Sequence, residues 1–228
     1  MSNVRVLAAA VFAAGLLVAC EGGGSTSSSG NTSPSSTSSI PNLWFTAAVT
    51  NNDSDLQAAA ASGADVNTHW RKNDDNTPLH KAAIAGSDRA IRFMIARGAD
   101  VNAVDEDKRT PLMIACHNSK TLAALALVEG NGDLNLKDRQ DQTALMFAAR
   151  RGQAEVVRAI AAKGGNLNVQ SREGKTAMHF AADIGHVEVV RALVAGGADK
   201  SIRDRRGRTA QDVAMIKERT EIVRLLSN

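Results

Sequence analysis

A seven-residue block that begins with threonine recurs at a constant interval of 33 residues along this chain. The block reads TPLHKAA at Thr77, TPLMIAC at Thr110, TALMFAA at Thr143, TAMHFAA at Thr176 and TAQDVAM at Thr209. A second block lies between the copies and reads ARGADVNA from Ala96, EGNGDLNL from Glu129, AKGGNLNV from Ala162 and AGGADKSI from Ala195. A period of this length is typical of a repeat architecture, because one such unit cannot bury its apolar face without its neighbours. We therefore predict a stack of similar units.

Each unit is predicted to contain two helices. A threonine such as Thr77 caps the first helix, and the proline that follows it suits the first helical position. Apolar residues at helical spacing, for example within 189–194, mark the second helix. Glycines are expected to end the helices in the left-handed region, namely Gly86, Gly152 and Gly185 after the first helix and Gly98, Gly164 and Gly197 after the second. Aromatic residues make up only 3% of the chain, which favours closely packed helices over a β-sandwich.

The repeat resembles the ankyrin repeat in its 33-residue period and in the motifs T-P-L-H-x-A-A and G-A-D-V-N. The resemblance covers residues 42–228. It implies an all-α ankyrin-repeat solenoid in which each unit is a helix-turn-helix followed by a hairpin. About six repeats are expected, including an N-terminal and a C-terminal cap.

The ends of the stack and three hairpins depart from the motif. Trp44 and Phe45 replace the motif leucine and histidine, and we expect them to cover the open N-terminal end; an exposed aromatic contact is the alternative. The last unit carries polar residues within 217–221 and is predicted to be the C-terminal cap. Where a glycine is usual two residues before the motif threonine, the chain has Asp75, Lys108 and Asp141. These hairpin tips are expected to be less regular.

The first 19 residues are predicted to be an export signal. Arg5 precedes an apolar run over residues 6–19, which is shorter than the roughly 20 residues that a membrane-spanning helix needs. The run ends in Leu-Val-Ala-Cys20, which resembles the bacterial lipobox. The resemblance implies that residues 1–19 are removed and that Cys20 carries the lipid of a palmitate-bearing lipoprotein. An ordinary signal peptide that contains a cysteine is the alternative.

The resemblance to a lipoprotein also implies a location. The protein would be anchored in the bacterial cell envelope and face the periplasm, and the outer membrane is favoured over the inner one because Glu21 is not aspartate. Residues 20–41 consist largely of serine, glycine and threonine, so they cannot bury enough apolar surface to offset the entropy of ordering. We interpret this segment as a disordered tether.

No catalytic motif emerges from the sequence. It contains no G-x-S-x-G, no glycine-rich phosphate loop, no H-E-x-x-H and no paired-cysteine metal spacing. His80 and His179 occupy the motif histidine position and are predicted to be structural, and His186 is predicted to be a surface or helix-start residue. Cys116 beside His117 occupies a motif alanine position, which favours a small buried thiol. We therefore expect no enzyme, no cofactor and no metal.

The resemblance implies that a partner binds the concave face, formed by the hairpin tips and the solvent side of the first helices. The variable positions on this face become basic towards the C-terminus. The candidate partner-binding residues are Arg139, Arg150, Arg151, Arg172, Lys175, Arg205, Arg206 and Arg208. A merely solvated surface remains the alternative. No nucleic-acid partner is expected, because the predicted compartment and the lack of interleaved aromatic residues disfavour one. The formal net charge of +3 does not by itself imply nucleic acid.

We predict a non-enzymatic, monomeric protein-protein interaction module that binds an envelope protein and touches the membrane only through its lipid; an acidic protein is a candidate for this partner. Alternatives are an immunity or inhibitor protein against a periplasmic toxin or hydrolase, an accessory factor in oxidative-stress protection, and an envelope protein that binds an anionic polymer. Fold does not decide among these roles.

Overall fold

The computed structural model describes residues 43–70 and 75–227. The predicted signal segment, Cys20 and the tether lie outside these residues. The described helices are α1 Leu43–Thr50, α2 Asp53–Ala61, α3 Pro78–Ala85, α4 Asp88–Ile95, α5 Pro111–His117, α6 Thr121–Glu129, α7 Ala144–Arg150, α8 Ala154–Ala162, α9 Ala177–Ile184, α10 Val187–Ala195, α11 Ala210–Ile216 and α12 Thr220–Ser227. Within the described part of the chain, none of these helices is long and apolar enough to span a membrane.

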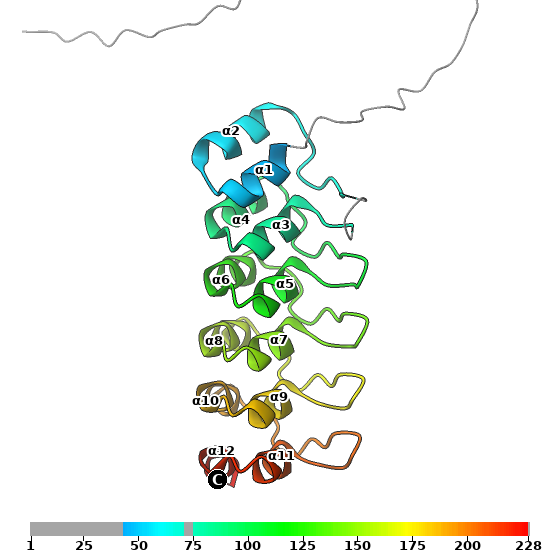
Figure 1. Ribbon diagram of the computed structural model, residues 1–228, viewed down its shortest axis with the longest axis vertical. Helices are drawn as coiled ribbons and strands as arrows, with labels where there is room; N and C mark the ends of the chain where they lie inside the picture. Colours follow the sequence, from blue (N-terminus) through cyan, green and yellow to red (C-terminus); the bar gives the residue numbers. More distant parts are fainter. Residues whose placement is uncertain (1–42, 71–74, 228) are drawn as a thin grey trace, which may run out of the picture. The chain divides into compact units, whose positions relative to one another are not determined.

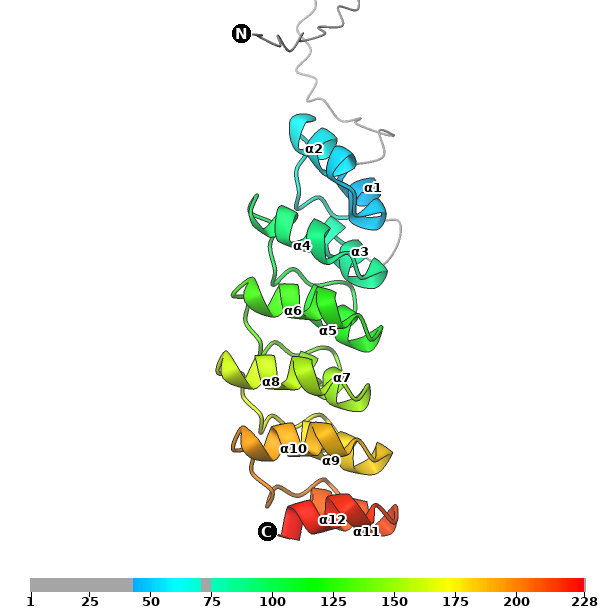
Figure 2. The same cartoon turned by 90° about the vertical axis from the view of Figure 1, so that its left-hand side faces the viewer.

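The helices form two columns, and the hairpins project from one of them (Figure 1). Each odd-numbered helix packs on the next odd-numbered helix from α1 to α11, and the even-numbered helices pack on one another from α4 to α12. Turned by 90°, the stack shows one helix pair above the next along its length (Figure 2). The predicted all-α solenoid with a 33-residue unit is therefore confirmed.

The core runs as a continuous layer between the two columns. The paired alanines of the motif, for example Ala82 and Ala83 in α3, are fully buried. Their small side chains let neighbouring helices approach closely, and larger residues such as Met113 and Ile160 fill the space between units. Each buried methylene contributes about 0.8 kcal/mol. Stacking therefore supplies most of the stability, since a lone unit would leave this layer exposed.

Threonine caps and left-handed residues delimit the helices as predicted, except that the Thr143 side chain makes no cap hydrogen bond to α7. Thr77 accepts a hydrogen bond from the backbone N–H of His80, and Thr110 accepts one from Met113. Gly86 and Gly185 end α3 and α9 with φ of 86° and 102°. The remaining motif glycines also adopt positive φ. The helix ends are thus determined by local backbone chemistry.

The expectation of less regular hairpins is wrong for the tips at Lys108 and Asp141. Their φ values of 60° and 57° lie in the left-handed region, as does the 74° of Gly174. The donor–acceptor pattern is also the same, because Lys108 N donates to Asp105 O and Gly174 N donates to the residue three positions earlier, at 3.0 and 2.8 Å. The hydrogen bonds of the tip hold a non-glycine residue in the conformation that glycine adopts freely.

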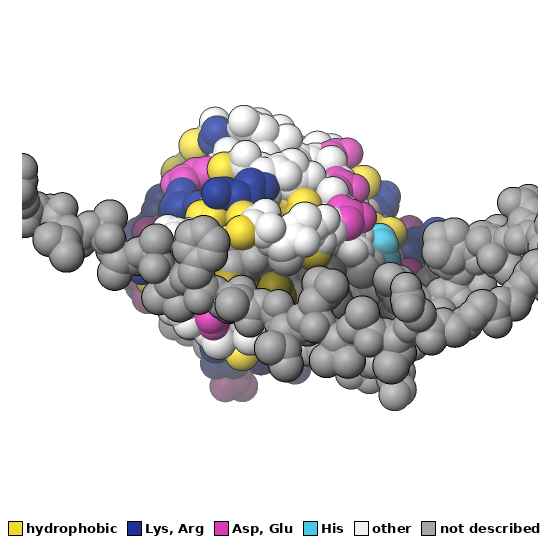
Figure 3. Space-filling model, turned by 90° about the horizontal axis from the view of Figure 1, so that it is seen from above, with side chains coloured by type: hydrophobic (Ala, Val, Ile, Leu, Met, Phe, Trp, Pro, Cys, Tyr) yellow, Lys and Arg dark blue, Asp and Glu magenta, His cyan; other side chains and the backbone are white. Residues whose placement is uncertain are grey.

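The side chains at the two ends of the stack differ in burial. Trp44 and Phe45 are buried in the first repeat, with exposed fractions of 2% and 6%, so the alternative of an exposed aromatic contact is wrong. The Trp44 indole donates to Ala64 O at 2.8 Å, and the Phe45 ring meets Trp70 edge-on at 4.8 Å. At the other end, Lys217 and its polar neighbours are exposed. Seen from the α1–α2 end, the described surface carries small separate groups of apolar, basic and acidic side chains (Figure 3).

Candidate functional site: the hairpin tips and the first helices

Backbone hydrogen bonds join the hairpin tips into one edge. Arg139 N donates to Asp107 O, Arg172 N to Gln140 O, and Arg205 N to Glu173 O, each at 3.0–3.1 Å. The edge lies on the side of the odd-numbered helices (Figure 1). We call this edge, together with the exposed sides of the odd-numbered helices, the concave face. Side chains from successive repeats therefore lie next to one another at fixed spacing.

A buried aspartate, Asp204, organises the tip of the hairpin between α10 and α11. One Asp204 oxygen accepts from the backbone N–H groups of Arg206 and Arg208, both at 2.9 Å, and the other accepts from the Arg208 guanidinium at 2.7 Å. Burial acts to raise the pKa of Asp204, but these hydrogen bonds outweigh it and hold the pKa at about 2. The charge of Arg208 is thus used inside the tip, which weakens its predicted role as a partner contact.

Arg150 is also held by its neighbours. Its guanidinium lies over the Phe180 ring of the next repeat, 4.4 Å from the centroid, and donates to Gln142 Oε1 at 3.4 Å. Burial lowers the Arg150 pKa, and the nearby Arg151 lowers it further. Lys175 Nζ lies 5.6 Å from the same ring and forms an ion pair with Glu173 at 2.7 Å. Phe180 therefore gathers two of the predicted residues around one aromatic side chain.

The remaining predicted residues differ in whether a carboxylate neutralises them. Arg139 lies 4.0 Å from Asp107, and Arg172 lies 3.4 Å from Asp141. Arg151, Arg205 and Arg206 are exposed, and none of them has a carboxylate within 4 Å among the residues that the structure describes. The sequence placed all eight residues on one face but could not rank them, because their ion pairs join different repeats.

Five of the eight predicted residues line one hollow of about 440 Å³ between the hairpin tip that precedes α9 and the tip that precedes α11. The lining consists of Arg172, Glu173, Lys175, Asp204, Arg205, Arg206 and Arg208. Arg139, Arg150 and Arg151 lie outside this hollow. The structure thus divides the predicted set into a basic hollow and a separate group near α7.

Apolar side chains also lie on this face, although the predicted partner-binding set contains only basic residues. Ile84 and Ile184, at the ends of α3 and α9, are both 41% exposed. Ile216, at the end of α11, is 60% exposed. The repeat alignment places these three residues at the end of a first helix. Their apolar character at this position was the sequence signal that could have identified them. The concave face is therefore mixed in chemistry.

The histidines have the structural roles that the motif predicts. His80 Nδ1 lies 2.8 Å from Thr77 Oγ1 and its Nε2 lies 3.0 Å from Arg109 O, which bridges two repeats. His179 repeats this arrangement with Thr176 and Arg208. Burial lowers the pKa of both rings, which favours the neutral form.

The side chains of Cys116 and His117 lie in different environments. Cys116 is fully buried, and burial raises the pKa of its thiol to about 12, which removes the thiolate that nucleophilic chemistry requires. His117 is exposed and meets Phe147 edge-on at 5.8 Å. Across residues 43–70 and 75–227, no three or more His, Cys, Asp or Glu side chains are grouped to hold a metal ion.

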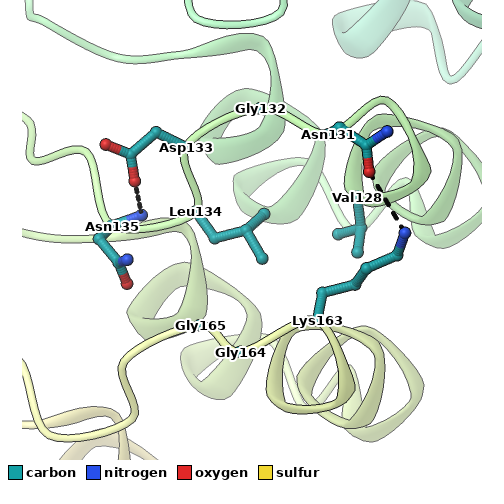
Figure 4. A pocket seen from close by; sticks show the side chains of 9 residues that line it. All are labelled: Val128, Asn131, Gly132, Asp133, Leu134, Asn135, Lys163, Gly164 and Gly165. Carbon is teal, nitrogen blue, oxygen red and sulfur yellow. Dashed lines mark hydrogen bonds between the residues drawn. The ribbon is translucent and has the colours of Figure 1, made fainter.

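A second hollow of about 270 Å³ lies where the second helices end. It is lined by Val128, Asn131, Gly132, Asp133, Leu134, Asn135, Lys163, Gly164 and Gly165 (Figure 4). Lys163 Nζ donates to Asn131 Oδ1 at 3.4 Å, and Asp133 accepts from the Asn135 N–H at 2.8 Å. Its polar groups thus serve the turns, and nothing in its lining suggests chemistry.

Comparisons with known proteins agree with this repeat structure. A family model described as ankyrin repeats (3 copies) matches residues 43–138, 90–171, 118–204 and 145–228. The chain is 31% identical over 93 residues to mouse Rabankyrin-5, which covers 36% of this chain and 8% of that protein. It is 39% identical over 70 residues to the rat Arf-GAP with coiled-coil, ANK repeat and PH domain-containing protein 2, covering 30% of this chain and 9% of that protein.

A shorter relative is a fission-yeast ankyrin repeat-containing protein, 28% identical over 82 residues, covering 34% of this chain and 36% of the relative. The chain spans only a small part of the curated relatives that it matches, so the similarity concerns the repeat itself. Ankyrin repeats typically mediate protein-protein interaction and are not themselves catalytic. From the family match over residues 43–228, together with the helix pairs and the hairpins, we conclude that this chain belongs to the ankyrin-repeat family.

Proposed function

We propose that this chain is a non-enzymatic module that holds one protein partner on its concave face. The observation that carries the proposal is that exposed apolar and cationic side chains share this face without serving the stack. Ile184 and Ile216 expose apolar surface, and Arg151 extends from the end of α7. Protein interfaces are enriched in arginine and contain apolar anchors at their centre.

The proposed location in the bacterial envelope rests on the sequence of residues 1–41. A lipid on Cys20 would anchor the chain, since a lipoprotein carries more than one acyl chain and two such signals suffice for stable binding. The serine- and glycine-rich segment would let the repeats reach a partner at some distance from the bilayer. The outer membrane is favoured over the inner membrane because Glu21, and not an aspartate, follows the cysteine.

Site-specific photo-crosslinking in cells tests the binding face. A photoreactive residue at Ile184 in the full chain should crosslink to a protein. The matched control is Leu122, which is 66% exposed on α6 in the other helix column. The proposal fails if Leu122 yields the same crosslinked products as Ile184, or if neither position yields any.

Cysteine substitution tests the anchor separately. Cys20→Ser should abolish labelling by a palmitate analogue and move the chain from the membrane fraction to the soluble one. Cys116→Ser is the matched control, because that thiol is buried in α5 and should carry no lipid. Membrane association that survives Cys20→Ser would contradict the lipid anchor.

A further inference from the structure

The basic hollow between the tips at residues 171–175 and 204–208 has a chemistry of its own. We propose that it binds the carboxylates of an acidic protein segment, and that Arg205 and Arg206 make the contacts. This inference rests on the proposed function, since it names the chemistry of the partner that the concave face would hold.

The charges around the hollow are only partly neutralised. Five basic and two acidic side chains line it. Arg208 is paired with Asp204 at 2.7 Å, and Lys175 is paired with Glu173, also at 2.7 Å. Both carboxylates of the lining are therefore already in use. Arg172 turns to Asp141, which belongs to the preceding tip, at 3.4 Å.

Two guanidinium groups are left without a carboxylate within 4 Å among the described residues, those of Arg205 and Arg206. They are adjacent in sequence and both exposed. Arginine presents a planar set of donors that matches a carboxylate in a bidentate way. Two such groups at the rim of one hollow suit a ligand that carries more than one carboxylate.

The backbone of both arginines is fixed before any ligand arrives. Arg205 N donates to Glu173 O at 3.0 Å, and Arg206 N donates to Asp204 Oδ1 at 2.9 Å. Gly174 permits this approach, because a Cβ at that position would lie 2.8 Å from Arg205 N. A prepared site loses less conformational entropy on binding, which favours affinity.

An acidic protein segment fits the surroundings better than a uniform polyanion. Glu173 stays exposed at the hollow although it pairs with Lys175, so a continuous run of phosphates would have to pass close to its carboxylate, whereas separated carboxylates can avoid it. α9 starts two residues after Lys175 and ends at the exposed Ile184. A peptide that follows α9 away from the hollow would therefore meet apolar surface, which a protein segment can use and a polyphosphate cannot.

The test is a binding titration on the full chain with a fluorescent glutamate-rich peptide as the probe. The variant Arg205→Glu/Arg206→Glu should weaken binding about tenfold or more, as expected for the loss of charged hydrogen bonds. The control variant Arg158→Glu/Arg224→Glu makes the same charge change on exposed arginines of α8 and α12 and should change affinity less than about twofold. If both variants lost affinity equally, the effect would depend only on net charge, and the proposal would be overturned.

Two further arms separate the alternatives. Polyphosphate that binds more tightly than the peptide, with the same dependence on Arg205 and Arg206, would assign the hollow to a polyanion and overturn the acidic-segment proposal. Ile184 crosslinking is then repeated in the Arg205→Glu/Arg206→Glu background. If the crosslink persists while wild-type chain does not bind the peptide, the hollow proposal fails and the proposed function stands. If Ile184 gives no protein crosslink even in wild-type chain, the proposed function fails.

Discussion

Gly165→Ala tests whether the packing between repeats depends on single methyl groups. Gly165 follows α8 and donates its N–H to Ile160 O at 2.9 Å. A Cβ at this position would lie 2.4 Å from Ile160 Cγ2 and 3.0 Å from Ile160 O. Ile160 is only 1% exposed, so its side chain has little room to move away.

The equivalent positions in two other repeats show why the clash is specific. Ala99 and Ala198 stand where Gly165 does, and their N–H groups donate to Met94 O and Leu193 O in the same way, both at 3.0 Å. Neither methionine nor leucine carries a Cγ2 methyl on its Cβ. The β-branched Ile160 is therefore what requires glycine five residues later.

The expected magnitude follows from two opposing terms. Inserting a methyl group into a packed core costs about 1–3 kcal/mol. Replacing glycine in a compatible backbone conformation returns about 0.4–1 kcal/mol through the unfolded state. Gly165→Ala should therefore lower the free energy of unfolding by about 1–2 kcal/mol.

The assay is urea unfolding of a double-mutant cycle, followed by circular dichroism. Ile160→Leu alone should cost less than about 1.5 kcal/mol, because it conserves side-chain volume. In the Ile160→Leu background, Gly165→Ala should be tolerated, because Ala198 occupies the equivalent position beside Leu193 in another repeat. A coupling energy below about 0.3 kcal/mol would refute this reasoning. So would a Gly165→Ala variant as stable as the parent chain.

Three other predictions concern buried polar groups. Burial lowers the pKa of His80 and His179 in the folded chain, so the unfolded chain, with histidines near 6.5, binds more protons at acidic pH. The urea concentration at the midpoint of unfolding should therefore be highest above pH about 6.5, and it should fall below that pH until the folded rings protonate. If the midpoint of the His80→Gln/His179→Gln variant depended on pH to the same extent, these histidines would not be the cause. Asp204→Asn should cost about 1–3 kcal/mol, measured by thermal unfolding at neutral pH, because it removes the acceptor charge for Arg208; no loss would show that the tip does not need the ion pair. Cys116 should react with a thiol reagent at pH 8 only after denaturant is added, because burial raises its pKa to about 12; fast labelling of the native chain would show that α5 opens readily.

The unit itself was predictable from sequence because its determinants are local. The threonine caps, the glycines that end helices and the apolar spacing act within one repeat, so the letters around Thr77 or Thr176 suffice to predict helix pairs. Repetition then implies stacking, since each unit exposes an apolar face. The structural role of the buried histidines was predictable for the same reason, because the Nδ1 of each ring lies within hydrogen-bond distance of the threonine of its own motif.

The charged surface depended on tertiary structure, whereas the hairpin tips depended on local hydrogen bonds that residue type alone does not predict. Lys108 adopts a left-handed conformation while its N–H donates to Asp105 O within the same tip. The sequence of the first 41 residues predicts an anchor, and that prediction awaits the Cys20→Ser experiment. The sequence does not distinguish among the eight basic residues, although they differ in the carboxylate or the aromatic ring that lies beside each of them.

The sequence alone specifies the repeating unit and the side of it that remains exposed. The stacking of the units decides which exposed charges already have a carboxylate or an aromatic ring beside them. Arg150 lies on Phe180 from the next repeat, and Arg172 turns to Asp141 from the preceding one. The hollow beside Arg205 and Arg206 likewise exists only between two tips. The physical reason is that these contacts join residues about one repeat apart, so they depend on how successive units stack.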